Sequence, residues 1–278
     1  MGEPMAKNLQ RAGTQLLVWN RSAPALKRLQ LDGTIAAPHA RDVLRSAAII
    51  IVMLRNAAAI DEVLERDSPQ FLQNVRDRTI VNMGTTAPAY SFDLSADIFA
   101  AGGSYVEAPV SGSRGQAEQG KLVAMLAGDP DLVSKVATLV SPMCAATFAC
   151  GAVPNALTTK LAVNIYLITM VTGLAEATNF AAKAGLDLHQ FRAILDAGPM
   201  ASSVSKGKLE KLVTEDLTAQ AAVSDVLMNA RLALAESRRA SASAPLLEQC
   251  ERLYSKAEQI GFGGTDMIGV IKAYDDGG

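Results

Sequence analysis

A turn rich in glycine and serine, residues 108–115, carries the first residues that could do chemistry, Ser111, Gly112 and Ser113. Its backbone N–H groups and hydroxyls can hold a small carboxylate. Further along, Lys160 is followed one helical turn later by Asn164, which puts both on one face of a helix. A partly dry lysine can pass a proton to a carbonyl oxygen and stabilise the charge that hydride delivery builds there. The two segments together predict a reductase of small acidic carbonyl compounds.

The composition limits the classes of protein to which the chain can belong. With 278 residues, 49% of them hydrophobic and 19% charged, the chain can bury a sizeable core in one large or two ordinary domains. A net charge of −2 gives no electrostatic reason to expect nucleic acid or an anionic membrane as a partner. The three cysteines and two histidines show no metal-ligand spacing (Cys144, Cys150, Cys250, His39 and His189). We therefore expect no metal site, and free thiols in a cytoplasmic protein.

No targeting or membrane segment is predicted. The residues after Met1 show no apolar run behind a basic start, so we expect no signal peptide. The stretch 161–175 is apolar, but Asn164 interrupts it and it falls short of the ~20 residues that a membrane span needs. We interpret it as part of a buried helix.

The first half of the chain alternates short apolar runs with helical patterns. The runs are 16–19, 48–53, 79–82, 104–107, 122–126 and 146–148, and the helical patterns are 4–12, 23–31, 40–46, 60–65, 90–101 and 130–139. Strands separated by helices imply βαβ units and a mainly parallel sheet.

After Pro154 no strand-like run follows. Helices are predicted over 158–184, 188–195, 219–239, 245–260 and 265–274. The fold class predicted is therefore α/β: a Rossmann-type, doubly wound, mainly parallel sheet in residues 1–153, followed by an all-helical domain in residues 154–278. We expect the active site in the cleft between the two domains.

The start of the chain has the second half of a dinucleotide-binding pattern. A Rossmann domain opens with a strand, then G-x-G-x-x-G, then a helix whose N-terminus faces the pyrophosphate. Gly2 opens the first helical pattern, and the strand after it ends at Asn20, which is the usual spacing. The first strand and the first two glycines of the pattern are expected ahead of Met1, and a chain without them should bind the cofactor poorly.

The end of that strand bears on the choice between NAD and NADP. An acidic residue there binds the ribose hydroxyls of NAD. Here Arg21 and Ser22 follow Asn20, and a cation with a hydroxyl suits the 2′-phosphate of NADP. NADP is therefore expected, with NAD as the alternative cofactor and a solvated loop arginine as the alternative interpretation of Arg21.

Four motifs, in the same order, resemble those of the β-hydroxyacid dehydrogenases, which include 3-hydroxyisobutyrate dehydrogenase, tartronate semialdehyde reductase and the glyoxylate/succinic semialdehyde reductases. Residues 1–9 resemble the second half of the family's G-x-G-x-M-G-x-P-M-A-x-N-L, and residues 18–22 resemble V-W-N-R-[ST]. Residues 107–113 resemble the substrate turn [DE]-A-P-V-S-G-[GS], and Lys160 with Asn164 resembles the catalytic lysine helix. Residues 111–118 are most similar to the glyoxylate/succinic semialdehyde subgroup.

The resemblance implies a fold, a reaction and an assembly. The family has a Rossmann-type domain and a helical domain, commonly paired into homodimers or homotetramers across the long helix. Its reaction is reversible hydride transfer between NAD(P) and a small hydroxy or aldehyde acid.

The resemblance also implies roles for individual residues. Lys160 would be the acid/base and Asn164 would orient it or the substrate. The carboxylate would be bound by Ser111, Gly112 and Ser113, and the ribose and nicotinamide would be lined by the strand ends at Met53, Leu54 and Thr85. From the residues alone, those strand ends could equally be plain exits from strand to loop.

The chain departs from the family at Ser224 and Asp225, where the family usually has Lys-Asp. Asp225 is still a candidate for substrate binding, while Ser224 removes a cation. Arg114, Lys206 and Lys208 are the candidates to replace that cation.

Two other functions compete with the reductase. One is an imine reductase of the same superfamily, a group that tends to replace the catalytic lysine, so that Lys160 argues against it. The other is a catalytically impaired NADP-binding or scaffold protein, which the incomplete phosphate loop and Ser224 favour. Lys160 taken alone would be read as a surface lysine; the turn and Asn164 shift the interpretation to catalysis.

Overall fold

The chain forms two compact units, Met1–Lys160 and Leu161–Gly278, in a computed structural model that describes residues 1–31 and 34–275. Helix α9 (Asn155–Lys183) begins in the first unit and continues into the second. The boundary predicted at residues 153 and 154 lies just ahead of this helix.

The first unit contains two sheets. The smaller is a parallel pair, β1 (Leu17–Val18) and β2 (Ile35–Ala36). The larger has the order β3-β4-β5-β7-β6, with β8 beside β7. Its strands are β3 (Ile49–Val52), β4 (Thr79–Asn82), β5 (Ser104–Glu107), β6 (Val110–Ser111), β7 (Leu122–Gly128) and β8 (Cys144–Ala149). Among the described strands of this sheet, only the pairs β5–β7 and β6–β7 are antiparallel, so the prediction of a mainly parallel sheet is confirmed.

The two sheets match a Rossmann sheet without its first strand. Such a sheet has the strand order 3-2-1-4-5-6. Here the pair β2-β1 corresponds to strands 3-2, and the run β3-β4-β5 corresponds to strands 4-5-6. No residue in 1–31 or 34–275 supplies the strand between them, as the sequence predicted.

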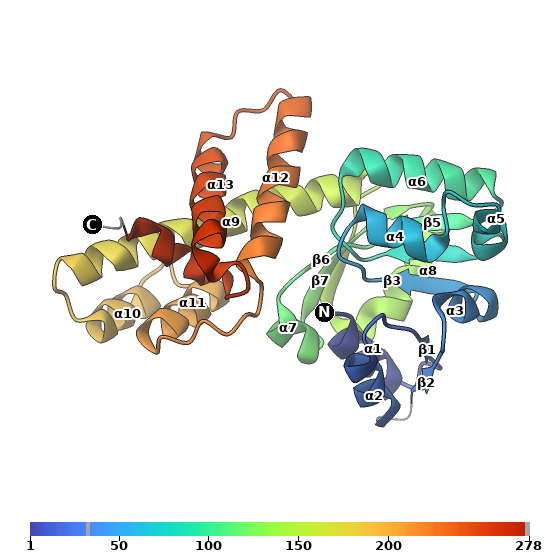
Figure 1. Cartoon of the computed structure of the whole chain (residues 1–278), viewed down its shortest axis with the longest axis horizontal. Helices are drawn as coiled ribbons and strands as arrows, with labels where there is room; N and C mark the ends of the chain where they lie inside the picture. Colours follow the sequence, from blue (N-terminus) through green and yellow to red (C-terminus); the bar gives the residue numbers. More distant parts are fainter. Residues whose placement is uncertain (32–33, 276–278) are drawn as a thin grey trace. The chain divides into compact units, whose positions relative to one another are not determined.

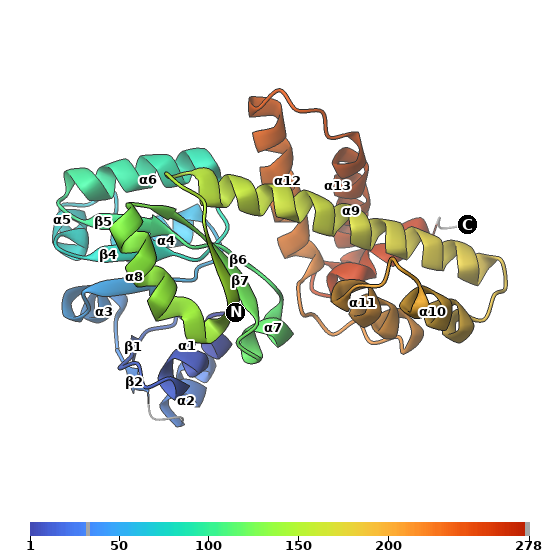
Figure 2. The same cartoon turned by 180° about the vertical axis from the view of Figure 1, so that it is seen from behind.

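Alternation along the central strands creates two buried faces. In β4, Ile80 packs into one cluster and Val81 into the other, because successive side chains of a strand point to opposite faces. Ile80 packs with helices α4 (Ala57–Leu64), α5 (Gln70–Val75) and α6 (Pro88–Ala100). Val81 packs with α1 (Gly2–Arg11) and α8 (Pro130–Val140). Figures 1 and 2 show α4 and α8 on opposite faces of the sheet.

The remaining helices of the first unit are α2 (Ala23–Leu31), α3 (Ala40–Ser46) and α7 (Arg114–Glu118), with a 3₁₀ turn, η1, at Ser141–Met143. The predicted helices 23–31 and 40–46 have the bounds expected. The short elements β2, β6, α5 and α7 were not predicted, because two to six residues are too few to establish a period.

The second unit is all helical, as predicted. It contains the rest of α9 with α10 (Leu188–Ala197), α11 (Ser203–Val213), α12 (Val223–Arg239) and α13 (Pro245–Ala257). Helices α12 and α13 form an antiparallel pair that crosses α9 (Figures 1 and 2). Leu161, Ile168 and Val171 of α9 pack into the core that this pair supplies.

Helix α9 begins three residues before the predicted 158, and α10 ends two residues after the predicted 195. Three further helices differ from the prediction for local reasons. The helix predicted over 219–239 begins at Val223, because the backbone N–H groups of Asp266 and Met267 bind the carbonyls of Leu217 and Ala221. The helix predicted over 245–260 gives way to a π-helical turn, η2 (Glu258–Phe262), in which Gly261 has φ 95°. The last helix is 3₁₀ rather than α, over η3 (Met267–Tyr274). The sequence also missed α11.

Candidate active site

Lys160 is a buried lysine near the start of α9. Its residue is 7% exposed, and it forms no hydrogen bond or ion pair within the part of the chain that the structure describes. Burial lowers the pKa of Lys160 from 10.5 to about 8, because the charged ammonium loses hydration without gaining an anion. A lysine with this pKa has both its ammonium and its amine form accessible near neutral pH, so it can donate or accept a proton.

Asn164 lies one turn further along α9 and is also buried, at 4% exposure. The i, i+4 spacing places it on the helix face of Lys160. Its amide offers both donors and an acceptor, so it can orient a lysine or a carbonyl group.

The predicted substrate turn connects β6 to α7. Ser111 ends β6, and its hydroxyl forms no hydrogen bond among the described residues. Gly112 has φ 130°, and a Cβ atom there would approach Leu122 Cδ2 to 2.8 Å. Both facts require glycine at this position. Because glycine has no side chain, none covers its backbone N–H.

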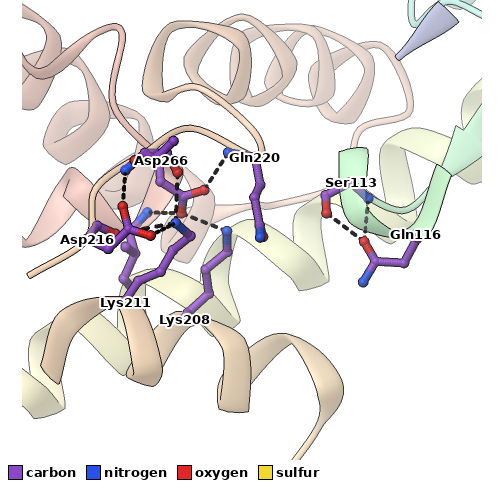
Figure 3. A network of polar contacts seen from close by, with 9 residues as sticks. Ser113, Gln116, Lys208, Lys211, Asp216, Gln220 and Asp266 are labelled. Atoms are coloured by element: carbon purple, nitrogen blue, oxygen red, sulfur yellow. Dashed lines mark hydrogen bonds and ion pairs between the residues drawn. The ribbon is translucent and has the colours of Figure 1, made fainter. Parts of the chain in front are cut away.

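Ser113 is held within the turn by a residue that the sequence did not single out, Gln116. The backbone N–H and the hydroxyl of Ser113 both donate to Gln116 Oε1, at 2.9 and 2.6 Å (Figure 3). The donors of Ser113 are therefore engaged inside the turn. No periodicity signals such a contact, but the i, i+3 spacing of a capping box could have found it.

The cofactor candidates gather in pairs at the carboxyl ends of the strands. A Cβ atom on Gly2 would lie 3.8 Å from Met53 Cβ, so the start of α1 packs beside the end of β3. A Cβ atom on Gly84 would lie 2.8 Å from the carbonyl oxygen of Leu54, and half-buried Thr85 follows it. A bare helix N-terminus beside strand ends that admit only glycine suits the close approach of a dinucleotide.

Asn20, Arg21 and Ser22 form an exposed corner after β1. The Asn20 amide donates to the Ser22 carbonyl oxygen at 3.0 Å and to the Ser22 hydroxyl at 2.9 Å. Because that hydroxyl accepts from Asn20, its own proton is left to donate to another group, and exposed Arg21 is the residue between the two. The corner can therefore present a cation and a hydroxyl to one phosphate.

The second unit holds Asp225 in the first turn of α12. The preceding Ser224 donates its hydroxyl to the Gly263 carbonyl oxygen at 2.9 Å, so this serine closes a contact inside its own unit.

Two of the three cations considered as replacements are committed to ion pairs. Lys208 Nζ lies 2.6 Å from Asp266 Oδ1, and both residues are buried (Figure 3). Arg114 pairs with Glu118 at 2.8 Å. Lys206 is exposed.

A buried carboxylate that the sequence analysis assigned no role, Glu107, caps α9. Its Oε2 accepts from the backbone N–H groups of Ala156 and Leu157, at 3.1 and 3.2 Å. Its sequence signals were its place at the end of a strand and at the acidic first position of the [DE]-A-P-V-S-G-[GS] pattern.

A Rossmann-type sheet, a helix N-terminus beside its strand ends and a buried lysine on the following helix define an NAD(P)-dependent dehydrogenase. Residues 1–151 match the family model described as the NAD-binding domain of 6-phosphogluconate dehydrogenase. Residues 155–274 match the family model described as NAD-binding of NADP-dependent 3-hydroxyisobutyrate dehydrogenase. The chain belongs to the β-hydroxyacid dehydrogenase family and is an NAD(P)-dependent hydroxyacid dehydrogenase of the 3-hydroxyisobutyrate type.

Individual relatives span the whole chain. Glyoxylate/succinic semialdehyde reductase 1 of Arabidopsis thaliana is 28% identical over 98% of this chain and 94% of its own. The crystal structure of 3-hydroxyisobutyrate dehydrogenase from Salmonella typhimurium has a TM-score of 0.90 at 22% identity, covering 98% of this chain and 96% of that one. The structure of Psf3 in complex with NADP+ and 2-OPP has a TM-score of 0.89 at 20% identity, covering 98% and 96%. The two structures show a shared fold.

The burial of Lys160 predicts a gain in stability when its charge is removed. The unfolded chain keeps the ordinary lysine pKa, so between about pH 8 and 10.5 the unfolded state binds more protons and stability rises with pH. Below pH 8 the whole penalty is present, and this pKa difference corresponds to about 3 kcal/mol. Lys160→Met should therefore raise the free energy of unfolding at pH 7 by up to about 3 kcal/mol, a gain that shrinks above pH 8.

Urea denaturation at pH 7 and pH 9.5 measures this difference. Lys135→Met, at an exposed position of α8, is the matched control and should change little. A Lys160→Met protein no more stable than the wild type at pH 7 would show that the ammonium is not buried at a cost.

Proposed function

We propose that the protein is an NADPH-dependent reductase of small aldehyde or keto acids, of the glyoxylate, succinic semialdehyde or 3-hydroxyisobutyrate type. The observation that carries this proposal is the buried Lys160, whose pKa burial alone lowers to about 8. The name of the Arabidopsis relative supports the choice of substrate class.

The proposed chemistry divides between the lysine and the turn. The nicotinamide cofactor, when bound, supplies the hydride. Lys160 stabilises the negative charge that develops on the carbonyl oxygen and donates its proton there. In the reverse direction the neutral amine takes the hydroxyl proton. The Ser111 hydroxyl and the Gly112 N–H are the donors proposed for the substrate carboxylate, and Asn164 and Asp225 are proposed to orient the reacting end.

Removing the ammonium tests the role of Lys160. Lys160→Ala should lower kcat for NADPH oxidation with glyoxylate or succinic semialdehyde by about 10²–10⁴, the usual contribution of a positioned acid. The KM for NADPH should change little. Lys135→Ala serves as the control, and an unaltered kcat in Lys160→Ala would remove Lys160 from the reaction.

The same assay should show opposite pH limbs in the two directions. Reduction needs the ammonium, so its rate should fall as the pH rises through about 8. Oxidation of the hydroxy acid needs the amine, so its rate should rise over the same range. Parallel limbs in the two directions would contradict a single lysine acting as acid and base.

NADP is proposed over NAD because of the corner at Arg21 and Ser22. Arg21→Ala should raise the KM for NADPH about tenfold or more, as expected for the loss of one charge-assisted hydrogen bond, and leave the KM for NADH unchanged. Arg11→Ala, at the exposed end of α1, is the control. Equal changes for the two cofactors would rule out recognition of the 2′-phosphate by Arg21.

A homo-oligomer is proposed because α9 exposes an apolar stripe. Val163, Tyr166 and Phe180 are 37, 71 and 70% exposed. Val163 and Tyr166 lie on neighbouring turns, and Phe180 follows about four turns further along the same side of the helix. By length and composition α9 is the one described helix apolar enough to cross a membrane, with a mean hydropathy of 1.4. Its other face packs into the core of the second unit, so a second copy of this chain is the partner proposed for the stripe.

Charge placed on the stripe should dissociate that assembly. The double variant Tyr166→Glu with Phe180→Glu should elute as a smaller species, because two carboxylates cannot be buried unpaired in an apolar interface. Light scattering after size exclusion measures the mass. Phe99→Glu is the control, since Phe99 is 81% exposed on α6. A wild-type monomer, or a variant that keeps the wild-type mass, would remove the stripe as an interface.

A further inference from the structure

Glu107 ties the strand that leads to the substrate turn to the helix that carries Lys160. It is 0% exposed, and its Oε2 accepts from Ala156 N–H and Leu157 N–H. These donors belong to the first turn of α9, which leaves its N–H groups without partners inside the helix. Lys160 follows in the next turn. One carboxylate therefore fixes the end of the helix on which the lysine stands.

The same residue also begins the segment that carries the turn. Glu107 is the last residue of β5, and Ser111 follows after only three residues. The carbonyl oxygen of Asn82 accepts from the backbone N–H of Ala108 at 2.7 Å, so the chain leaves Glu107 on a fixed path. The distance between the proposed carboxylate donors and the proposed acid/base is thus set through Glu107.

A buried chain of hydrogen bonds lies beside Glu107 and leads to the cofactor edge. The backbone N–H of Gly84 donates to Asn82 Oδ1 at 3.0 Å, and Asn82 Nδ2 donates to the Tyr105 hydroxyl at 3.1 Å. Tyr105 lies 2.7 Å from the hydroxyl of Ser91. Because the Tyr105 oxygen accepts from Asn82, we assign the Tyr105 proton to Ser91.

That assignment leaves the Ser91 proton available, and the Ser91 hydroxyl is close enough to Glu107 to act on its pKa. Glu107 Oε1 is buried and accepts no hydrogen bond in the described residues. Burial raises the pKa of Glu107, while the Ser91 hydroxyl and the N–H groups of Leu157 and Ala156 oppose this by favouring the carboxylate. Arg66 is the other charged group that acts on this cluster, through Tyr105.

We propose that Glu107 is a positioning residue, which holds Lys160 at its buried place relative to the substrate turn by capping α9. The proposal rests on the function proposed above and deepens it. It concerns geometry, since Glu107 forms no hydrogen bond or ion pair with Lys160 among the described residues. A shift of about 1 Å in a reacting group is enough to lose much of the rate.

Three variants separate positioning from general stability. Glu107→Ala removes the cap. Glu107→Gln keeps an oxygen that can accept both N–H groups. Asp129→Ala is the matched control, because Asp129 caps α8 in the same way, accepting from Asp131 N–H and Leu132 N–H at 3.1 Å each, on a helix without Lys160.

The first readout needs no substrate. The pH dependence of Lys160 labelling by an amine-selective reagent, followed by mass spectrometry of its peptide, should have its midpoint near pH 8 in the wild type. In Glu107→Ala the midpoint should move up towards 10.5 as Lys160 gains access to water. Glu107→Gln should restore the wild-type midpoint, and Asp129→Ala should leave it in place.

The second readout is the split between kcat and KM. Glu107→Ala should lower kcat for the aldehyde acid at least about tenfold with little change in the KM for NADPH, and Glu107→Gln should recover most of that loss. If Glu107→Ala does not fold, Glu107→Asp, which keeps the charge on a shorter side chain, is measured in its place.

An unchanged labelling midpoint in Glu107→Ala overturns the proposal. A shift as large in Glu107→Gln or in Asp129→Ala overturns it too, since it would mean that charge or general loosening is responsible. A wild-type protein that reduces none of the acids contradicts the proposed function instead, and the labelling still decides whether Glu107 positions Lys160.

Discussion

The burial of one ammonium is the constraint on which the rest of this structure depends. Lys160 is withdrawn from water with no anion beside it, and its pKa falls to about 8 for that reason alone. A carboxylate in contact would have stabilised the charge and held the proton too firmly for transfer. The first unit instead uses a buried carboxylate, Glu107, to bind backbone N–H groups at the start of α9. The helix end is stabilised while the lysine keeps its lowered pKa.

Other polar groups are buried next to the strand ends where the cofactor is proposed to bind, and each of them also has a partner. Asn82, Ser91 and Tyr105 are buried, and they satisfy one another in an ordered series of donors and acceptors. Burial raises the pKa of Tyr105, so this hydroxyl stays neutral and serves only as a hydrogen-bonding link. Such a network is stable only when each member has a partner, which makes its geometry specific. The network therefore holds the strand ends at Asn82 and Gly84 in one geometry, next to the place proposed for the cofactor.

Sequence reasoning found what periodicity and composition encode. The parallel strands of the first unit, the helical second unit and the Lys160–Asn164 spacing all follow from local patterns. Glu107 was missed because its role is a contact with Ala156, 49 residues away in the chain. Gln116 is only three residues from Ser113, and the spacing of a capping box could have found it. Lys208 was offered as a replacement for the cation missing at Ser224, and only the structure shows that Asp266 already neutralises it. The start of α12 was predicted too early for a similar reason. The segment ahead of it is bound at its carbonyls by the backbone N–H groups of Asp266 and Met267, at the start of η3.

The ion pairs of Lys208 and Arg114 determine which charged groups are left to bind a substrate carboxylate. With Lys208 and Arg114 held in ion pairs, the donors proposed for the substrate carboxylate are neutral groups of the turn at Ser111 and Gly112. Lys206, the third candidate, is exposed to water, which weakens its attraction for an anion. We infer that Lys160 is the buried cation that faces the bound acid. A carboxylate nearby favours the ammonium form and raises the pKa of Lys160 above about 8. Binding of an acidic carbonyl compound would thereby load the proton that its own reduction consumes, whereas a neutral aldehyde would leave the lysine partly deprotonated. Selectivity for acids would then arise in the proton-transfer step as well as in binding.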